Sequence, residues 1–241
     1  MNSFNNDLFI VIPARNEEET LPSILQEITK TITRNVLVVD NNSSDATFSI
    51  AKRYTDHVIK ERHPGYGNAC LAGIYYINKL QPGPWYICFF DGDGQSLVSD
   101  ISKIVKPLVS SDMINYCQGT RMIYRSSRSS LTGSAFVANR VFSFILSKIW
   151  RQKLTDLGPL RCIRLELLNK LHMSSKTYAW TIEMNTKLLK LQEPILEIPV
   201  NYSIRKSGIS KISGSIKTSL RAAIIMSIFF VKTALFWRVK L

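Results

Sequence analysis

The stretch at residues 85–96, WYICFFDGDGQS, decides the fold, because six apolar residues lead directly into two aspartates and a glutamine. A short apolar run bounded by glycines predicts a buried strand, and Asp91, Asp93 and Gln95 would then follow its carboxyl end. One interpretation is a plain turn, because Asp-Gly is a frequent turn pair. The other is a cation site, because Mg²⁺ typically takes one or two carboxylates together with substrate phosphates.

Apolar segments upstream of this stretch predict further strands, at residues 8–13, 36–40 and 57–60. A helix is expected after each, with Thr20 as the cap of the first, residue 54 as the end of the second and residues 68–80 as the third. Continuous apolar strands that alternate with helices predict an α/β fold, in which helices cover both faces of a mostly parallel sheet.

Polar residues gather at one edge of this predicted sheet. Ligands of such sheets bind beyond the carboxyl ends of the strands. The loop at residues 13–17, Asp40 and the aspartate pair are all expected there. This convergence favours a binding site over a plain turn.

The composition bounds the class of protein. Hydrophobic residues make up 45% of the chain, which supports a folded core and argues against global disorder. The 31 Lys and Arg against 18 Asp and Glu give a net charge of +13, which suits phosphorylated substrates, anionic lipid or nucleic acid. A nucleic-acid-binding protein remains an alternative, but no zinc-finger or RNP-like motif supports it and the aspartate pair would be unexplained.

Cysteine spacing and the first residues indicate a reducing, cytoplasmic location. The four cysteines, Cys70, Cys88, Cys117 and Cys162, form no CxxC pair and are expected to be buried free thiols. The first residues lack the basic-then-apolar order of a secretory signal.

The last segment differs from the rest of the chain. A mainly apolar run at residues 222–231 lies between Arg221 and Lys232, and a bilayer crossing needs about twenty apolar residues. We therefore expect residues 1–214 to form the α/β domain and residues 215–241 to form an amphipathic helix on an anionic membrane surface, at its cytosolic face. The alternative is a helix packed on the domain or on another subunit.

Seven segments occur in an order that resembles the family 2 glycosyltransferases. They are VIPARNEEETLP (11–22), VVDNNSSDAT (38–47), GYGNACLAGI (65–74), FFDGDGQ (89–95), GTR (119–121), TDLGPLRCIR (155–164) and the run from Arg205 to Lys211. Over residues 8–214 the chain is most similar to the dolichol- and polyprenol-phosphate sugar synthases. The resemblance implies a GT-A fold, a UDP- or GDP-linked sugar as donor, Mg²⁺ or Mn²⁺ as cofactor, and inversion at the anomeric carbon.

The resemblance also implies roles by position. The loop that holds the nucleotide base comprises Pro13, Ala14, Arg15, Asn16 and Glu17. The carboxylate that reads the base or ribose is Asp40, although this residue could instead cap the next helix. The metal and diphosphate group comprises Asp91, Asp93 and Gln95. The basic residues are Arg121, at an acceptor phosphate, and Arg205 and Lys211, which stabilise the departing diphosphate.

The implied acceptor is a polyprenyl phosphate, whose oxygen is already ionised and needs no general base. Asp156 would then position groups or pair with Arg161 or Arg164. In the alternative, the acceptor is a hydroxyl of a glycan or small molecule, and Asp156 is the base. Glu183 on a predicted helix is either a buried, paired residue at the acceptor pocket or a solvated one. The sequence GPLR at residues 158–161 departs from the TGSFR-type stretch of many relatives, so the acceptor is less constrained than the donor.

Overall fold

The computed structural model describes residues 7–204 and 216–238. In chain order, its elements are β1 (Leu8–Ala14), α1 (Leu21–Thr31), β2 (Val36–Asp40), α2 (Thr47–Ala51), β3 (Val58–Lys60), α3 (Tyr66–Ile77), β4 (Tyr86–Phe89), α4 (Ser99–Ser110), β5 (Tyr116–Thr120), α5 (Arg125–Ser129), α6 (Gly133–Trp150), β6 (Arg161–Arg164), α7 (Leu165–Lys170), α8 (Trp180–Lys190), β7 (Leu196–Pro199) and α9 (Ile216–Phe236).

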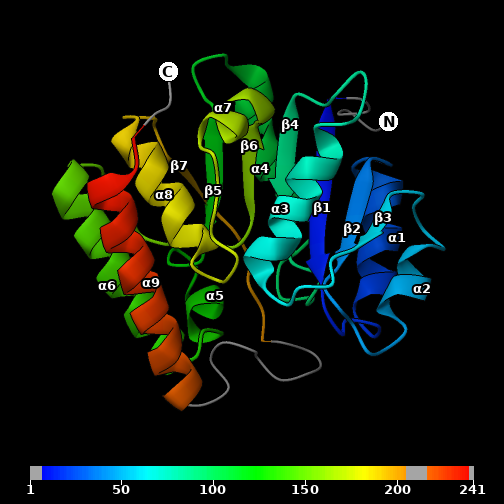
Figure 1. The fold of residues 1–241 in the computed structure, drawn as a ribbon, viewed down its shortest axis with the longest axis horizontal. Helices are drawn as coiled ribbons and strands as arrows, with labels where there is room; N and C mark the ends of the chain where they lie inside the picture. Colours follow the sequence, from blue (N-terminus) through cyan, green and yellow to red (C-terminus); the bar gives the residue numbers. More distant parts are fainter. Residues whose placement is uncertain (1–6, 205–215, 239–241) are drawn as a thin grey trace.

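The described strands form one sheet in the order β3-β2-β1-β4-β6-β5-β7 (Figure 1). Strands β1 to β4 pair in parallel, β6 is antiparallel to both β4 and β5, and β7 is parallel to β5. This arrangement confirms the mostly parallel sheet and shows that β6 makes it mixed. The chain leaves β1 for β2 on one side and later returns to β4 on the other, so the loops after β1 and β4 border a topological switch point.

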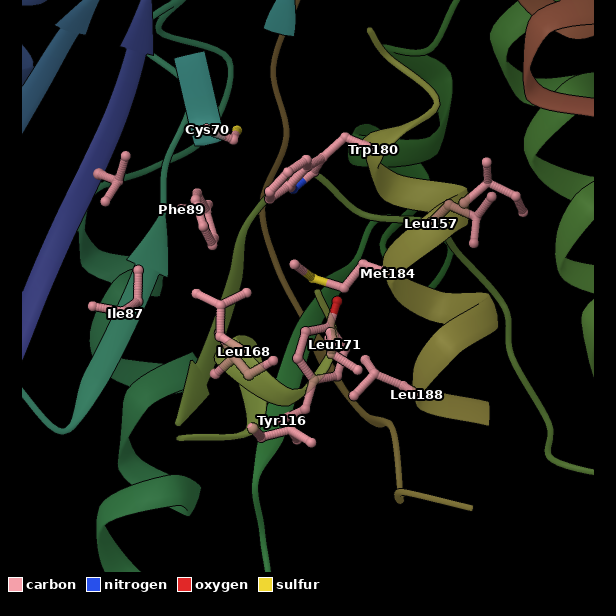
Figure 2. Packing of buried hydrophobic residues seen from close by; sticks show 14 of the residues in the cluster. Cys70, Ile87, Phe89, Tyr116, Leu157, Leu168, Leu171, Trp180, Met184 and Leu188 are labelled. Atoms are coloured by element: carbon pink, nitrogen blue, oxygen red, sulfur yellow. The ribbon is translucent and has the colours of Figure 1, made fainter. Parts of the chain in front are cut away.

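Successive residues of the apolar strands point to opposite faces, and each face has its own core. Ile10 of β1 packs with α1 and α4 on one face, whereas Val11 packs with α3 and α8 on the other. Figure 2 shows the second core, where Trp180 of α8 lies edge-on to Phe89 of β4 at 5.8 Å between ring centroids. Helices therefore cover both faces of the sheet, as predicted.

Helix α9 packs on α8 and α6 at the β7 end of the molecule (Figure 1). Met226, Phe229 and Phe230 contact the core beneath them. Among the described residues, no helix combines the length and apolar composition that crossing a bilayer would need. The helix packs on the domain, as the alternative for this segment held, and its association with a membrane surface stays a prediction.

Three local expectations are resolved by the structure. Thr20 makes no side-chain cap to α1, because its hydroxyl donates instead to the carbonyl of Gly92 at 2.6 Å. The helix expected to reach residue 54 ends at Ala51, and turns follow it. The cysteines are buried and free, as predicted.

Candidate active site

The loop after β1 is fastened to the loop after β2. Asn16 adopts a positive φ of 54°, a conformation that asparagine tolerates better than most residues. Its side-chain oxygen accepts the N–H of Ser44 at 2.9 Å, and its own N–H donates to the hydroxyl of Ser43 at 3.0 Å. The N–H of Glu17 donates to the hydroxyl of Thr47 at 2.8 Å. The loop predicted to hold the nucleotide base, residues 13–17, therefore has a fixed backbone.

Asp40 ends β2 beside this loop and is buried. Its Oδ1 accepts the N–H of Ser43 at 3.3 Å, within the turn that follows the strand. The alternative that Asp40 caps the next helix is wrong, because Asp45 accepts the N–H of Thr47 at 3.0 Å where α2 begins. Its predicted role toward the donor stays a prediction.

Asp91 and Asp93 lie in a tight turn directly after β4, at the switch point. Gly94 has a φ of +73° and supplies the conformation that the turn requires. The hydroxyl of Thr20 holds the turn against the start of α1 through the carbonyl of Gly92. The two interpretations of this stretch are therefore compatible: residues 91–94 form a turn, and the turn carries two aspartates at the edge of the sheet where donor ligands are expected.

The environment of Asp91 fits a cation. Within the described part of the chain, its Oδ1 is buried and has no hydrogen-bond partner. Burial raises the pKa of Asp91, whereas the nearby guanidinium of Arg161 and the hydroxyl of Tyr66 act in the opposite direction. A buried, unpaired carboxylate oxygen is costly unless a proton or cation reaches it.

The described residues contain no group of three His, Cys, Asp or Glu side chains able to hold a metal ion. A cation here would therefore rely on Asp91, Asp93 and oxygens of a bound diphosphate, which is the coordination that Mg²⁺ commonly uses.

Gln95 faces the segment after β7. Its Oε1 accepts from the hydroxyl of Tyr202 at 2.9 Å, and its Nε2 donates to the carbonyl of Ser203 at 3.0 Å. If Gln95 also bound a metal ion through Oε1, as predicted, the metal ion and the Tyr202 hydroxyl would share this oxygen. Gln95 thus links the donor-side loop to residues 202–203.

Arg121 follows β5 and forms a buried ion pair with Asp156. The carboxylate accepts the backbone N–H, Nε–H and Nη2–H of Arg121 at 2.7, 2.8 and 2.7 Å. Asp156 is fully buried, whereas the Arg121 side chain keeps 11% of its surface exposed. The carboxylate therefore fixes the guanidinium in one orientation while leaving part of it accessible.

The expected pairing of Asp156 with Arg161 or Arg164 is wrong. Arg161 donates to the carbonyl of Gly158, and Arg164 pairs with Asp112. The cause is the close crossing of the 155–158 loop over β5, where a Cβ on Gly158 would meet the carbonyl oxygen of Gly119 at 1.8 Å. This crossing brings the aspartate to the residue that directly follows β5.

Glu197 of β7 fixes the backbone of the loop at residues 155–158. The sequence alone did not identify this residue. Its carboxylate accepts the N–H groups of Thr155 and Asp156 at 2.9 Å each. Burial raises its pKa. Its role depends on β7 pairing with β5, for which the sequence carries no local signal.

Glu183 is buried and paired, one of its two predicted states. Its carboxylate lies 2.7 Å from the ammonium of Lys187 and also accepts the N–H groups of Ser174 and Ser175. It is not among the residues that line the pocket beside Arg121. Glu183 is therefore a structural anchor of the loop before α8, and the solvated alternative is wrong.

A pocket of about 200 Å³ opens beside Arg121, between α6, the start of α8 and α9. It is lined by Arg121, Ser134, Ala135, Ala138, Asn139, Leu157, Tyr178, Thr181, Ala222, Ala223 and Met226. Four alanines keep the space between α6 and α9 open. Among the residues that the structure describes, the pocket therefore combines one cation with mainly apolar walls.

Arg205 and Lys211, the other predicted basic site residues, lie outside the described residues. The donor loop, Asp40 and the aspartate pair occupy the carboxyl-end edge of the sheet. Gln95 and Tyr202 connect this edge to Arg121, Asp156 and the pocket.

A family model described as Glycosyl transferase family 2 matches residues 9–171. An uncharacterized glycosyltransferase of Mycobacterium tuberculosis is 31% identical over 219 residues, which cover 88% of this chain and 93% of the relative. The undecaprenyl-phosphate mannosyltransferase of Micrococcus luteus is 25% identical over 221 residues, which cover 86% of this chain and 87% of that protein.

Among solved structures, the glucosyl-3-phosphoglycerate synthase of Mycobacterium tuberculosis was determined in complex with Mn²⁺, UDP and phosphoglyceric acid. It matches with a TM-score of 0.70 at 19% identity, over 95% of this chain and 78% of that chain. This likeness supports the predicted GT-A-like fold. The family match spans more than half of the chain, so the protein belongs to glycosyl transferase family 2 and is a glycosyltransferase.

Proposed function

We propose that this glycosyltransferase moves a sugar from a nucleotide diphosphate to a polyprenyl phosphate at a membrane surface. The observation that carries the proposal is the apolar pocket beside Arg121, between α6, α8 and α9. Arginine recognises phosphate well, and apolar walls suit a hydrocarbon chain. The relative from Micrococcus luteus is named for transfer to undecaprenyl phosphate.

The Arg121–Asp156 pair favours a phosphate acceptor over a hydroxyl. A guanidinium has five N–H donors, and the carboxylate of Asp156 takes Nε–H and one Nη2–H. Donors that neither Asp156 nor the Tyr202 hydroxyl takes can bind an acceptor phosphate, which is already ionised and needs no base. For a hydroxyl acceptor, Asp156 would have to act as a base while remaining buried against Arg121.

A small phosphorylated acceptor is the second candidate, because the structurally similar synthase was solved with phosphoglyceric acid. Such an acceptor would use Arg121 but would leave the apolar walls of the pocket without a purpose. The pocket volume of about 200 Å³ is below the roughly 300–1,000 Å³ of common ligand sites. We therefore expect it to hold the phosphate and the adjoining end of the hydrocarbon chain of a long lipid, with the rest of the chain outside.

On the donor side, the fixed loop at residues 13–17 and Asp40 are proposed to hold the nucleoside of a UDP- or GDP-linked sugar. Mg²⁺ or Mn²⁺ bound at Asp91 and Asp93 would neutralise charge on the departing diphosphate. Arg205 and Lys211 are proposed to stabilise the same leaving group. The acceptor oxygen attacks the anomeric carbon opposite the leaving oxygen, so the configuration inverts.

The outer faces of α6 and α9 support a peripheral membrane location. Large apolar side chains there are between 49% and 74% exposed: Val137, Val141, Phe144, Leu220, Ile224, Ile228, Val231, Leu235 and Phe236. On α9, the exposed apolar residues from Leu220 to Leu235 recur at intervals of three or four residues and so form one stripe. Arg140, Lys148, Arg221 and Lys232 on the same helices are exposed cations.

An apolar stripe bordered by cations suits an anionic lipid surface. The same two helices line the pocket, so a lipid could enter it directly from the membrane.

The proposal is tested by filling the pocket. Ala138→Phe adds bulk to its lining, and Val137→Phe adds similar bulk at an adjacent position that is 60% exposed. With a short prenyl phosphate, Ala138→Phe should raise the acceptor KM at least about tenfold and leave the donor KM unchanged. Val137→Phe should keep both values within about twofold of wild type. Equal acceptor KM values for the two variants would contradict a lipid in this pocket.

A further inference from the structure

We infer that Tyr202 is a positioning residue of the transfer reaction, which links the donor-side loop to the arginine of the acceptor pocket. The inference rests on the proposed function and assigns a role to a residue outside the predicted site. Tyr202 directly follows Asn201 in the segment after β7.

The hydroxyl of Tyr202 is attached to the donor-side loop. It donates to Oε1 of Gln95 at 2.9 Å. Gln95 is in turn bonded to Asp93 of the aspartate pair, because its N–H donates to Oδ1 of Asp93 at 3.1 Å. A shift of the tyrosine hydroxyl would therefore pull on the loop that carries both carboxylates.

The ring of Tyr202 lies against the acceptor-side cation. The guanidinium carbon of Arg121 lies 5.0 Å from the ring centroid, within the range of a cation–π contact. Asp156 holds the same guanidinium through Nε and Nη2. The carboxylate and the ring together restrict the plane of Arg121.

The backbone of Tyr202 has anchors of its own, which separates positioning from folding. Its N–H donates to the hydroxyl of Ser127 at 2.9 Å, and that hydroxyl donates to the carbonyl of Val200 at 3.1 Å. The next residue back, Asn201, donates its N–H to Asp100 at 2.7 Å. Changing the side chain alone leaves these bonds in place, so the variants below should fold.

The two ends of the side chain predict different kinetic effects. Tyr202→Phe keeps the ring beside Arg121 and removes the hydroxyl, which contacts both Gln95 and the Arg121 guanidinium. It should lower kcat about two- to tenfold, the effect of one neutral hydrogen bond, and should raise the acceptor KM by less than Tyr202→Ala does. Tyr202→Ala removes both contacts and should also raise the acceptor KM about 3- to 30-fold.

The experiment measures kcat and both KM values of the full chain with a short prenyl phosphate and a nucleotide sugar. It compares wild type, the two Tyr202 variants, Arg121→Gln, and Arg121→Gln combined with Tyr202→Ala. Glutamine removes both the charge and the guanidinium, whereas lysine would keep a cation–π contact with the ring. If Tyr202 acts through Arg121, Tyr202→Ala should change the acceptor KM of Arg121→Gln by less than about twofold.

The inference is overturned if the effects of Tyr202→Ala and of the Arg121 substitution on the acceptor KM multiply independently. It is also overturned if Tyr202→Phe and Tyr202→Ala raise the acceptor KM equally, or if the Tyr202 variants lower only the melting temperature. Measuring metal-dependent hydrolysis of the donor distinguishes a wrong role for Tyr202 from a wrong acceptor. A wild type that hydrolyses the donor but does not modify the lipid contradicts the acceptor. In that case, slower hydrolysis by Tyr202→Phe supports the link to the donor loop, and an unchanged rate overturns it.

Discussion

Replacing Asp156 with asparagine distinguishes a positioning carboxylate from a general base. The carboxylate is fully buried and accepts three N–H groups of Arg121 at 2.7–2.8 Å. Asparagine keeps the shape but removes the charge and presents an NH₂ group to at least one arginine donor. Breaking a buried ion pair costs about 3–5 kcal/mol, against a typical total stability of about 5–15 kcal/mol.

For a chain of this length, each kcal/mol corresponds to about 2–4 °C, so Asp156→Asn should lower the melting temperature by roughly 6–20 °C. Activity should fall as well, because Arg121 loses its fixed orientation. The assay combines thermal melting with steady-state kinetics on the same preparations. Asp112→Asn is the matched control, because Asp112 is fully exposed where it pairs with Arg164 at 3.1 Å. No resolvable change in its melting temperature is expected.

The opposite pattern would refute this reasoning. A melting temperature within about 2 °C of wild type, combined with a loss of activity of about 10²–10⁴-fold, is what removal of a general base would produce. Asp156 would then act on a hydroxyl acceptor, and the ion pair would not govern its role.

Three further predictions concern the scaffold. Glu183→Gln breaks a buried i,i+4 ion pair and should lower the free energy of unfolding in urea by about 3–5 kcal/mol. Glu166→Gln breaks an exposed ion pair of the same spacing and should not change it measurably. Equal effects of the two variants would contradict this ranking. Burial raises the pKa of Cys117 to about 12, so about 10⁻⁴ of this thiol is ionised at pH 8. All four cysteines are buried, so thiol reagents should label them only after denaturation. Rapid labelling of the native protein would contradict their burial. Gly67→Ala places a Cβ 2.0 Å from a backbone carbonyl oxygen and should destabilise the fold by about 1–3 kcal/mol. In the control Gly133→Ala, the added Cβ meets nothing within 4 Å. Equal melting temperatures of the two variants would refute the close contact at Gly67.

Local sequence signals were sufficient for the donor side of the molecule. The apolar runs of β1, β2 and β4 each end in polar loop residues, and parallel pairing then brings those loops to one edge. The positions of Asp40 and Asp91 follow from strand ends alone. Strand boundaries depend on neighbouring residues in the chain, which is why the sequence could predict them.

The acceptor side depends on contacts between distant segments. Arg121 and Asp156 are 35 residues apart, and their pairing requires β6 to enter the sheet antiparallel between β4 and β5. The cap expected of Thr20 failed for the same reason, because the carbonyl of Gly92 competes for its hydroxyl. Tyr202 gave no signal, since a single tyrosine after a strand is common and its partners come from two other loops.

Transfer of a labelled sugar from UDP- and GDP-linked donors tests the central claim most directly. The acceptors are a short prenyl phosphate and, separately, phosphoglycerate, with Mn²⁺ or with EDTA. We expect label in the lipid only when the divalent cation is present, and its loss in Asp93→Ala. Label in phosphoglycerate, or donor consumption without labelled lipid, would contradict a polyprenyl phosphate acceptor.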